Sequence, residues 1–419
     1  MFVGIGQHRQ FLASLVVSFA AILVPGVTSA LGQTVVTIAD TQTVVPGTNA
    51  TFAEFTDARE LSVHGAVFHA LDSDGGQGLY LHHQNLLEVI ADTSTIVPGM
   101  SARFERFYDV SFAGDDVVFT ATWSRDEGVS QGLEGVFLFD RKSGEIESVL
   151  VSESASVRRF HGVEAGAGII VLSGGSQRLT SSHGDSESLL VSRRPGHVRE
   201  LYARGELRPG GGEFNGFNDN ISVRQGQLLF VDARFDDYHP AAGIYTLRSD
   251  SKALQVVADS NTRAPRDRGG LFETFGTCDW DGNDVYFTGN PGHSRFGLYA
   301  GTSPVDLRAL VLPFRAFVPG TDRKFTNLDR SISHQGGVTV FGGIWDQDEA
   351  GEIEGAGVFA IEGEAIVPVL VRGDGLDRVR VWRAWCRPQC NYGRSALLEV
   401  ELRGQLTGEK RRGLYQVDW

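Results

Sequence analysis

The stretch Ile38–Gly47 reads IADTQTVVPG and is followed by a phenylalanine pair, Phe52 and Phe55. Almost the same letters return at Ile90–Gly99, IADTSTIVPG, again followed by two phenylalanines three residues apart. Self-similarity at a fixed period indicates a repeat architecture and decides the fold before any single motif is interpreted. The organisation of the chain therefore depends on how many further copies it holds.

Two markers recur together along the chain, each seven times at spacings of 52 to 60 residues. The first is a pair of aromatic or apolar residues three apart, and the second is a glycine followed by an apolar and an aromatic residue. The pairs end at Phe55, Phe107, Phe160, Phe217, Phe275, Leu328 and Trp382. The second marker begins at Gly78, Gly135, Gly243, Gly297, Gly357 and Gly413, with Ser188 as a degenerate copy. Seven units of one kind are expected.

Each unit has the composition of strands and turns. Short runs of β-branched and aromatic residues, such as Val117–Thr120 and Val285–Thr288, follow turns rich in glycine, asparagine or aspartate. No window shows an apolar period of 3.6 residues with capping signals at both ends. The pattern predicts an all-β chain built as a seven-bladed β-propeller, with four antiparallel strands in each blade.

The two ends of the repeat region are complementary. Thr34–Ala39 resembles the fourth strand of a unit, and Leu414–Val417 resembles a third strand that has no fourth strand after it. Pairing these two segments closes the ring and leaves no exposed edge at the seam. A linear solenoid is the alternative, and it favours distinct capping repeats at its ends. We expect one propeller domain over residues 31–419.

Residues 1–30 have the features of an export signal. An apolar run over Phe11–Val24 follows His8 and Arg9, and small residues at Thr28 and Ala30 occupy the positions expected for cleavage. The run is shorter than the about 20 residues that a membrane-spanning helix needs. The sequence predicts a secreted or periplasmic monomer without a membrane span.

Charge and composition narrow the class of partner. The 419 residues include 21% charged and 41% hydrophobic residues, which is typical of a folded protein. The formal net charge of −14 argues against a nucleic-acid partner, because nucleic-acid binders carry basic surfaces. A protein or a glycan is the expected kind of partner.

Three cysteines suggest one local disulfide. Cys386 and Cys390 are close enough in sequence to be joined across a turn, and Cys278 is left as a buried thiol. A zinc site needs more ligands than this spacing provides.

The IADTxTxVPG motif followed by Phe-x-x-Phe resembles the repeat of exported bacterial tandem-repeat proteins, often called choice-of-anchor proteins. The similarity covers the chain after the export signal and is sharpest at Ile38–Phe55 and Ile90–Phe107. The resemblance implies a propeller and export. It assigns no ligand, and this chain has no recognisable C-terminal anchor.

Acidic residues recur where the fourth strand of one unit leads into the next. These candidate ligand-binding residues are Asp40, Asp92, Glu153, Glu206, Asp259 and Asp374. On one face of a propeller they could bind Ca²⁺ or draw a cation into the central funnel. The alternative is that each carboxylate caps a turn by accepting backbone N–H groups, and recurrence in most units favours this interpretation. No metal site is assigned.

Non-repeated polar residues in the loops of units three to five are the candidate catalytic groups: His183, Asp236, Asp237, His239 and His293. Histidines and carboxylates that converge on one sector would supply general acid and base groups. The sequence contains no nucleophile elbow, phosphate loop or zinc-protease motif. The first interpretation is therefore a binding module that uses its acidic, loop-rich face, and the alternative is an extracellular hydrolase or lyase.

Overall fold

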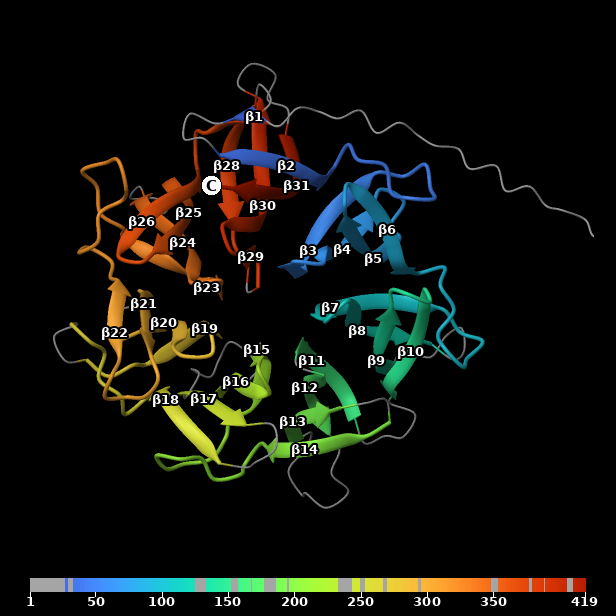
Figure 1. The fold of residues 1–419 in the computed structure, drawn as a ribbon, viewed down its shortest axis with the longest axis horizontal. Coiled ribbons are helices and arrows are strands. Elements are labelled where there is room, and N and C mark those ends of the chain that lie inside the picture. Colours follow the sequence, from blue (N-terminus) through green and yellow to red (C-terminus); the bar gives the residue numbers. More distant parts are fainter. Residues whose placement is uncertain are drawn as a thin grey trace, which may run out of the picture.

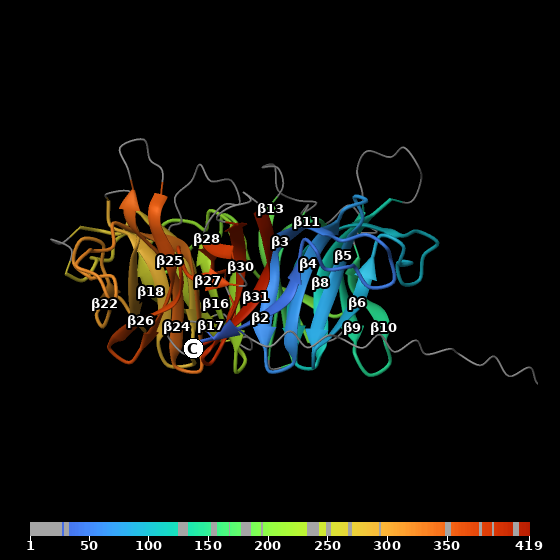
Figure 2. The same cartoon turned by 90° about the horizontal axis from the view of Figure 1, so that it is seen from above.

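The computed structural model describes residues 27–28, 33–124, 133–151, 157–166, 168–176, 186–193, 196–232, 243–248, 253–266, 270–292, 295–347, 353–376, 379–387, 389–404 and 410–419. These residues form seven four-stranded antiparallel blades around a central axis, a β-propeller without helices in the described part of the chain (Figure 1). Seen from the edge, the blades stand side by side in a flat disc (Figure 2). The all-β class and the seven blades predicted from the sequence are confirmed.

In blades one to six, the first strand lies closest to the axis (Figure 1). The strands of blades one to three are β3 (Phe52–Ser62), β4 (Gly65–Asp72), β5 (Gln77–His83), β6 (Leu86–Asp92), β7 (Phe104–Ala113), β8 (Asp116–Trp123), β9 (Leu133–Asp140), β10 (Glu145–Val151), β11 (Val157–Gly166), β12 (Ile169–Ser176), β13 (Ser186–Ser192) and β14 (Val198–Ala203). Those of blades four and five are β15 (Phe217–Arg224), β16 (Gln227–Asp232), β17 (Gly243–Arg248), β18 (Leu254–Asp259), β19 (Thr274–Trp280), β20 (Val285–Asn290), β21 (Gly297–Gly301) and β22 (Arg308–Val311).

Blade six consists of β23 (Asn327–Gln335), β24 (Val338–Gln347), β25 (Ile353–Glu362) and β26 (Ala365–Val371). The seventh sheet contains β28 (Val379–Trp385), β30 (Ser395–Gly404), β31 (Lys410–Asp418) and β2 (Thr34–Asp40), with the short strands β1 (Val27–Thr28), β27 (Gly375–Leu376) and β29 (Asn391–Tyr392). Within this sheet β2 pairs antiparallel with β31, with Val35 opposite Val417 and Thr37 opposite Tyr415. The strand β2, near the start of the described chain, thus supplies an outer strand of the last blade.

The two sequence markers meet in the core of blades one, two, four, five and six. In blade one, the rings of Phe52 and Tyr80 pack edge to face with centroids 4.9 Å apart. Phe104 and Phe137 repeat this contact in blade two, also at 4.9 Å. The glycine of the second marker makes room for the ring, because a Cβ atom on Gly78 would lie 2.7 Å from the Tyr80 hydroxyl. The repeat in the sequence is therefore a repeat of core packing.

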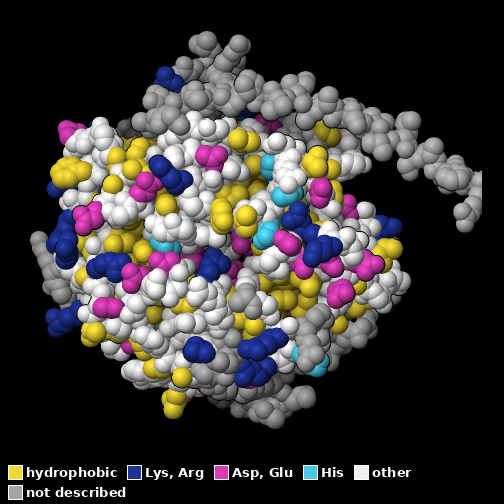
Figure 3. Space-filling model, in the orientation of Figure 1, with side chains coloured by type: hydrophobic (Ala, Val, Ile, Leu, Met, Phe, Trp, Pro, Cys, Tyr) yellow, Lys and Arg dark blue, Asp and Glu magenta, His cyan; other side chains and the backbone are white. Residues whose placement is uncertain are grey.

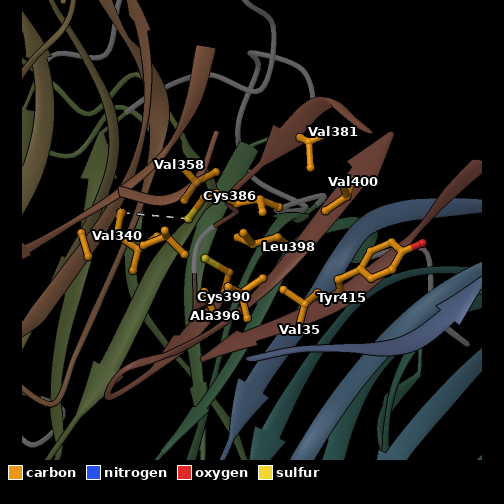
Figure 4. Close-up of a cluster of buried hydrophobic side chains, with 14 of the residues drawn as sticks. Val35, Val340, Val358, Val381, Cys386, Cys390, Ala396, Leu398, Val400 and Tyr415 are labelled. Carbon is orange, nitrogen blue, oxygen red and sulfur yellow. Dashed lines mark hydrogen bonds between the residues drawn. The ribbon is translucent and has the colours of Figure 1, made fainter. Parts of the chain in front are cut away.

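The predicted disulfide is not formed: Cys386 and Cys390 are both buried free thiols. Figure 4 shows the two sulfurs in the apolar cluster of the seventh blade, beside Val340 and Val358. The Cys386 thiol donates to the carbonyl oxygens of Arg387 at 3.4 Å and Val340 at 3.9 Å. Each cysteine thus packs as a small apolar residue. Cys278 is a buried free thiol, as predicted.

Candidate functional site

The inner strands of blades one to six place one polar residue each at the same height around the axis. We call these residues the axial ring. Each lies opposite the second or third residue of the second strand in its own blade. The axial ring consists of Glu60, Ser111, Glu164, Ser222, Asp279 and Ser333, and their partners are Val67, Val118, Val171, Leu229, Tyr286 and Val340. All six residues are buried, and they alternate between carboxyl and hydroxyl groups.

The axial ring joins neighbouring blades by hydrogen bonds. The backbone N–H of Phe112 in blade two donates to Glu60 Oε2 at 2.6 Å, and that of His334 in blade six donates to Asp279 Oδ2 at 2.8 Å. Serine hydroxyls make further bonds between blades, since Ser111 donates to Glu164 Oε2 at 3.2 Å and Ser222 donates to Asp279 Oδ1 at 3.1 Å. The axial ring therefore has a structural role, independent of any ligand.

Burial changes the protonation of the carboxyl groups in the axial ring. Burial raises the pKa of Glu60 to about 7, although the Phe112 N–H and the charge of Arg224 oppose the rise. Burial and the nearby Glu60 raise the pKa of Glu164 well above its ordinary value. Burial lowers the pKa of Arg224, but the charges of Asp279, Glu164 and Glu60 outweigh this effect and raise it. Two protonatable carboxyl groups and one guanidinium thus interact around the axis.

A cavity of about 190 Å³ lies on the axis beside this ring. Glu164, Ser222 and Asp279 of the ring contribute to its wall, together with Arg59, Asp109, Val110, Val163, Asn220, Ile221, Thr277, Cys278, Ser331, Arg387 and Gln389. Figure 3 shows one face of the disc, where acidic side chains gather around the central hollow.

Glu164 is the acidic wall residue with a buried oxygen that has no partner among the described residues, and Arg59 and Arg387 of the same wall also have buried nitrogens without one. Its side chain is 3% exposed, and Gln389 and Ser111 both donate to Oε2. Oε1 is buried and has no hydrogen-bond partner among the described residues. By contrast, Asp109 is held by backbone, since Val163 N–H donates to its Oδ2 at 2.7 Å and Val110 N–H to its Oδ1 at 3.0 Å. Glu164 Oε1 can therefore accept a hydrogen bond from a ligand in the axial cavity.

The predicted acidic residues between the blades cap turns. Asp92 Oδ1 accepts hydrogen bonds from Ser94 N–H, Ser94 Oγ and Thr95 Oγ1 at 2.6 to 2.9 Å. Asp40 and Asp259 accept the equivalent bonds from the residues two and three positions later. Asp374 Oδ2 accepts from Val371 N–H at 2.9 Å. The turn interpretation is confirmed for these four residues, and Glu206 has a backbone bond in the corresponding turn.

The candidate catalytic residues His183, Asp236, Asp237, His239 and His293 lie outside the described residues, as does Glu153. Their convergence stays a prediction. Within the described ranges, no group of three or more histidine, cysteine, aspartate or glutamate side chains is arranged to hold a metal ion. No helix in the same ranges is long and apolar enough to cross a membrane.

Sequence reasoning missed the axial ring because its distance from the first marker varies. Glu60 lies five residues after Phe55, whereas Ser111 lies four residues after Phe107. The difference arises from irregular pairing between the marker and the ring, with breaks in register between Phe55 and Arg59 and between Phe107 and Val110. The only available signal was a polar residue near the end of each apolar inner strand.

Comparison with known proteins adds a family of unknown function, DUF7453, whose model matches residues 21–154, about a third of the chain. No curated protein sequence matches. The choice-of-anchor resemblance stays a prediction.

Solved propellers are similar in fold at low sequence identity. The β-propeller domain of the Trilobed protease from Pyrococcus furiosus is 10% identical, with a TM-score of 0.47, over 86% of this chain and 98% of that domain. TolB from Acinetobacter baumannii is 9% identical with a TM-score of 0.36, over 74% of this chain and 62% of TolB. Trypanosoma rangeli sialidase is 10% identical with a TM-score of 0.39, over 89% of this chain and 60% of the sialidase. These similarities assign no function to the chain.

Proposed function

We propose that the protein is an exported binding module that takes a small organic cation, a primary amine, into the axial cavity. The observation that carries this proposal is Glu164, a buried carboxyl group in the cavity wall with a free acceptor oxygen. The acids Asp109, Glu164 and Asp279 outnumber the two arginines of the wall, and Arg59 is paired with Glu399. An ammonium group is a compact cation with three donors, which suits these oxygens.

The overall charge favours the same class of ligand. With a formal net charge of −14, the protein attracts cations to its surface and raises their local concentration at the axis. The turn-capping acids Asp40, Asp92 and Asp259 contribute to this negative charge. Their oxygens, however, already accept hydrogen bonds from backbone N–H and hydroxyl groups. The acidic face thus serves to attract the ligand, and the axial cavity binds it.

Calorimetric titration with putrescine tests the proposal, with 1,4-butanediol as the uncharged analogue. Putrescine is expected to bind at one site per chain, and butanediol is not. Glu164→Gln keeps the shape of the side chain and should weaken putrescine binding about tenfold, the loss expected for one charge-assisted hydrogen bond. Asp92→Asn is the matched control, since it removes an equal charge at a blade corner. Equal binding by the Glu164→Gln variant would contradict the proposal, and Ca²⁺ in the same titration tests an inorganic cation.

A hydrolase or lyase is the second candidate function, favoured by the pKa of about 7 at Glu60. A carboxyl group that titrates near neutral pH can act as a general acid or base. An assay for release of reducing ends or amines from glycans and peptides tests this function. Activity that is lost in the Glu60→Gln variant would support an enzyme. Absence of turnover on every substrate tested would favour the binding module.

A further inference from the structure

The corner between blades five and six departs from the repeat. Val311–Gly320 reads VLPFRAFVPG, and alignment on Val-Pro-Gly places Pro313 where Asp40 and Asp92 stand in their corners. Without the carboxylate, backbone groups alone hold the turn. The N–H groups of Arg315 and Ala316 donate to Leu312 O at 3.2 and 3.0 Å, and Phe314 N–H donates to Phe325 O at 2.7 Å. Backbone hydrogen bonds therefore close this corner, and no acidic residue stands at the position of Asp40 and Asp92.

A cavity of about 440 Å³ opens at this corner, more than twice the volume of the axial cavity. This rim pocket is lined by Pro291, Arg295, Gly297, Tyr299, Leu312, Pro313, Phe314 and Arg315. The lining combines an apolar wall with two guanidinium groups. Pockets that bind small molecules commonly have this composition, with a mainly apolar lining and a few placed polar groups.

The charge of the rim pocket is opposite to that of the protein. Its lining contains two arginines and no acid, in a chain of formal net charge −14. Neither Arg295 nor Arg315 forms an ion pair with any residue that the structure describes. Glu273 lies beside Gly292, near the pocket, but is not part of its wall. Two guanidinium groups without carboxylate partners favour an anionic ligand, and arginine matches a carboxylate in a bidentate geometry.

Phe314 provides an aromatic surface in the same pocket. Its side chain is 51% exposed, and its backbone has a φ of 60°, in the left-handed region that bulky residues rarely adopt. The guanidinium of Arg295 lies 4.2 Å from the ring centroid, and Arg295 Nη1 donates to Thr326 O at 3.3 Å. Unusual backbone conformations of this kind concentrate at ligand clamps. The ring and the cation are thus held together before any ligand arrives.

We propose that the rim pocket is a second binding site, specific for an aromatic carboxylate. The aromatic part would pack against Phe314, Leu312 and Pro313, and the carboxylate would pair with Arg315 and Arg295. The site is independent of the axial cavity, because the two cavities share no lining residue and favour ligands of opposite charge.

Fluorescence titration of the full chain with 2-naphthoate tests this site. Saturable binding at one site per chain is expected, with 2-naphthylmethanol and 2-naphthylmethylammonium about tenfold weaker because they lack the anionic group. Arg315→Gln and Arg295→Gln should each weaken 2-naphthoate binding about tenfold. Arg383→Gln, which removes an exposed arginine from β28, is the matched control and should bind as the wild type does.

Pro313→Asp provides a second and independent variant, since it restores the acid found at the other corners. It should abolish 2-naphthoate binding while the thermal unfolding temperature stays within a few degrees of the wild type. Putrescine binding at the axis should be unchanged in all these variants, which separates failure of this site from failure of the axial one. Absence of saturable 2-naphthoate binding, equal binding of the uncharged alcohol, or unchanged affinity in both arginine variants would overturn the proposal.

Discussion

Arg59 of β3 and Glu399 of β30 form a buried ion pair across the seam between the first and last blades, with Nη1 and Oε2 3.1 Å apart. The position of Arg59 is apolar in the next five blades, where Val110, Val163, Ile221, Cys278 and Ile332 occupy the same register. Arg412 of β31 contacts the other oxygen of Glu399. The blades that are farthest apart in sequence are therefore joined by a polar contact at a position where the other inner strands pack apolar side chains.

Arg59→Met should destabilise the protein by about 3 to 5 kcal/mol, because Glu399 would be left buried without its main partner. Urea unfolding measures this free energy. The double variant Arg59→Val with Glu399→Thr should recover most of the loss. It uses the residues at the same register in blade two, where Val110 corresponds to Arg59 and Thr120, opposite Val136, corresponds to Glu399, opposite Leu414. A double variant as unstable as Arg59→Met would show that the pair is not the source of the effect.

Glu60→Gln should make the protein less sensitive to pH between about 4.5 and 7. The folded pKa of Glu60 is raised to about 7 from an ordinary value of 4.5, so the folded state binds its proton more tightly than the unfolded state does. The resulting stability is fully present below pH 4.5 and is lost as the pH rises through 7. The shift corresponds to about 3 kcal/mol at about 1.4 kcal/mol for each pKa unit.

Unfolding free energies of the wild type and Glu60→Gln at pH 5 and pH 8 test this linkage. The unfolding free energy of the variant should rise relative to that of the wild type as the pH increases. Glutamine is neutral at both pH values, and its side-chain oxygen can still accept a hydrogen bond from Phe112 N–H. A difference in unfolding free energy between the two proteins that is the same at pH 5 and pH 8 would contradict the raised pKa of Glu60.

Asp92→Ala should lower stability by about 1 to 2 kcal/mol, since Asp92 accepts three hydrogen bonds within its turn. Asp92→Asn keeps one acceptor oxygen and should lose less. Putrescine affinity should change little in either variant. A large loss of affinity at constant stability would instead assign the corner acids to the ligand site.

Removal of residues 1–40 should destabilise the whole propeller, because β2 pairs with β31 and buries Val35, Ile38 and Ala39. The unpaired edge of β31 would also favour association between chains. Thermal unfolding and gel filtration measure both effects. Removal of residues 1–32 is the control and should leave the unfolding temperature close to that of the full chain. Equal stability of the two truncated proteins would show that the seam does not depend on β2.

Putrescine binding should strengthen as the pH rises. Burial and the neighbouring Glu60 raise the pKa of Glu164, so a proton competes with the ammonium ion for this carboxyl group. Binding should therefore release protons, which calorimetry in two buffers of different ionisation enthalpy detects. A titration heat that does not depend on the buffer would argue against Glu164 as the binding group.

The architecture could be predicted from the sequence because the markers form the blade cores. Phe52 and Tyr80 touch, and the corresponding rings touch in blades two, four, five and six. The turn role of Asp92 could also be predicted, since its threonine and serine partners follow it directly. The axial ring could not be predicted, because one extra residue before Glu60 or Ser222 shifts its spacing from the marker relative to Ser111 or Glu164. The rim pocket could not be predicted, because alignment of the corners shows Pro313 in the place of Asp40 and Asp92 but not the cavity that Arg295, Phe314 and Arg315 line in the folded chain.

The central claim is that a small amine occupies the axial cavity, and a crystal of the protein soaked with 3-bromopropylammonium tests it most directly. Anomalous scattering locates the bromine without ambiguity. The account predicts a bromine peak inside the cavity, with the ammonium group beside Glu164 Oε1, and no such peak in the Glu164→Gln variant. An empty axial cavity, with peaks only at the blade corners or on the outer surface, would contradict it.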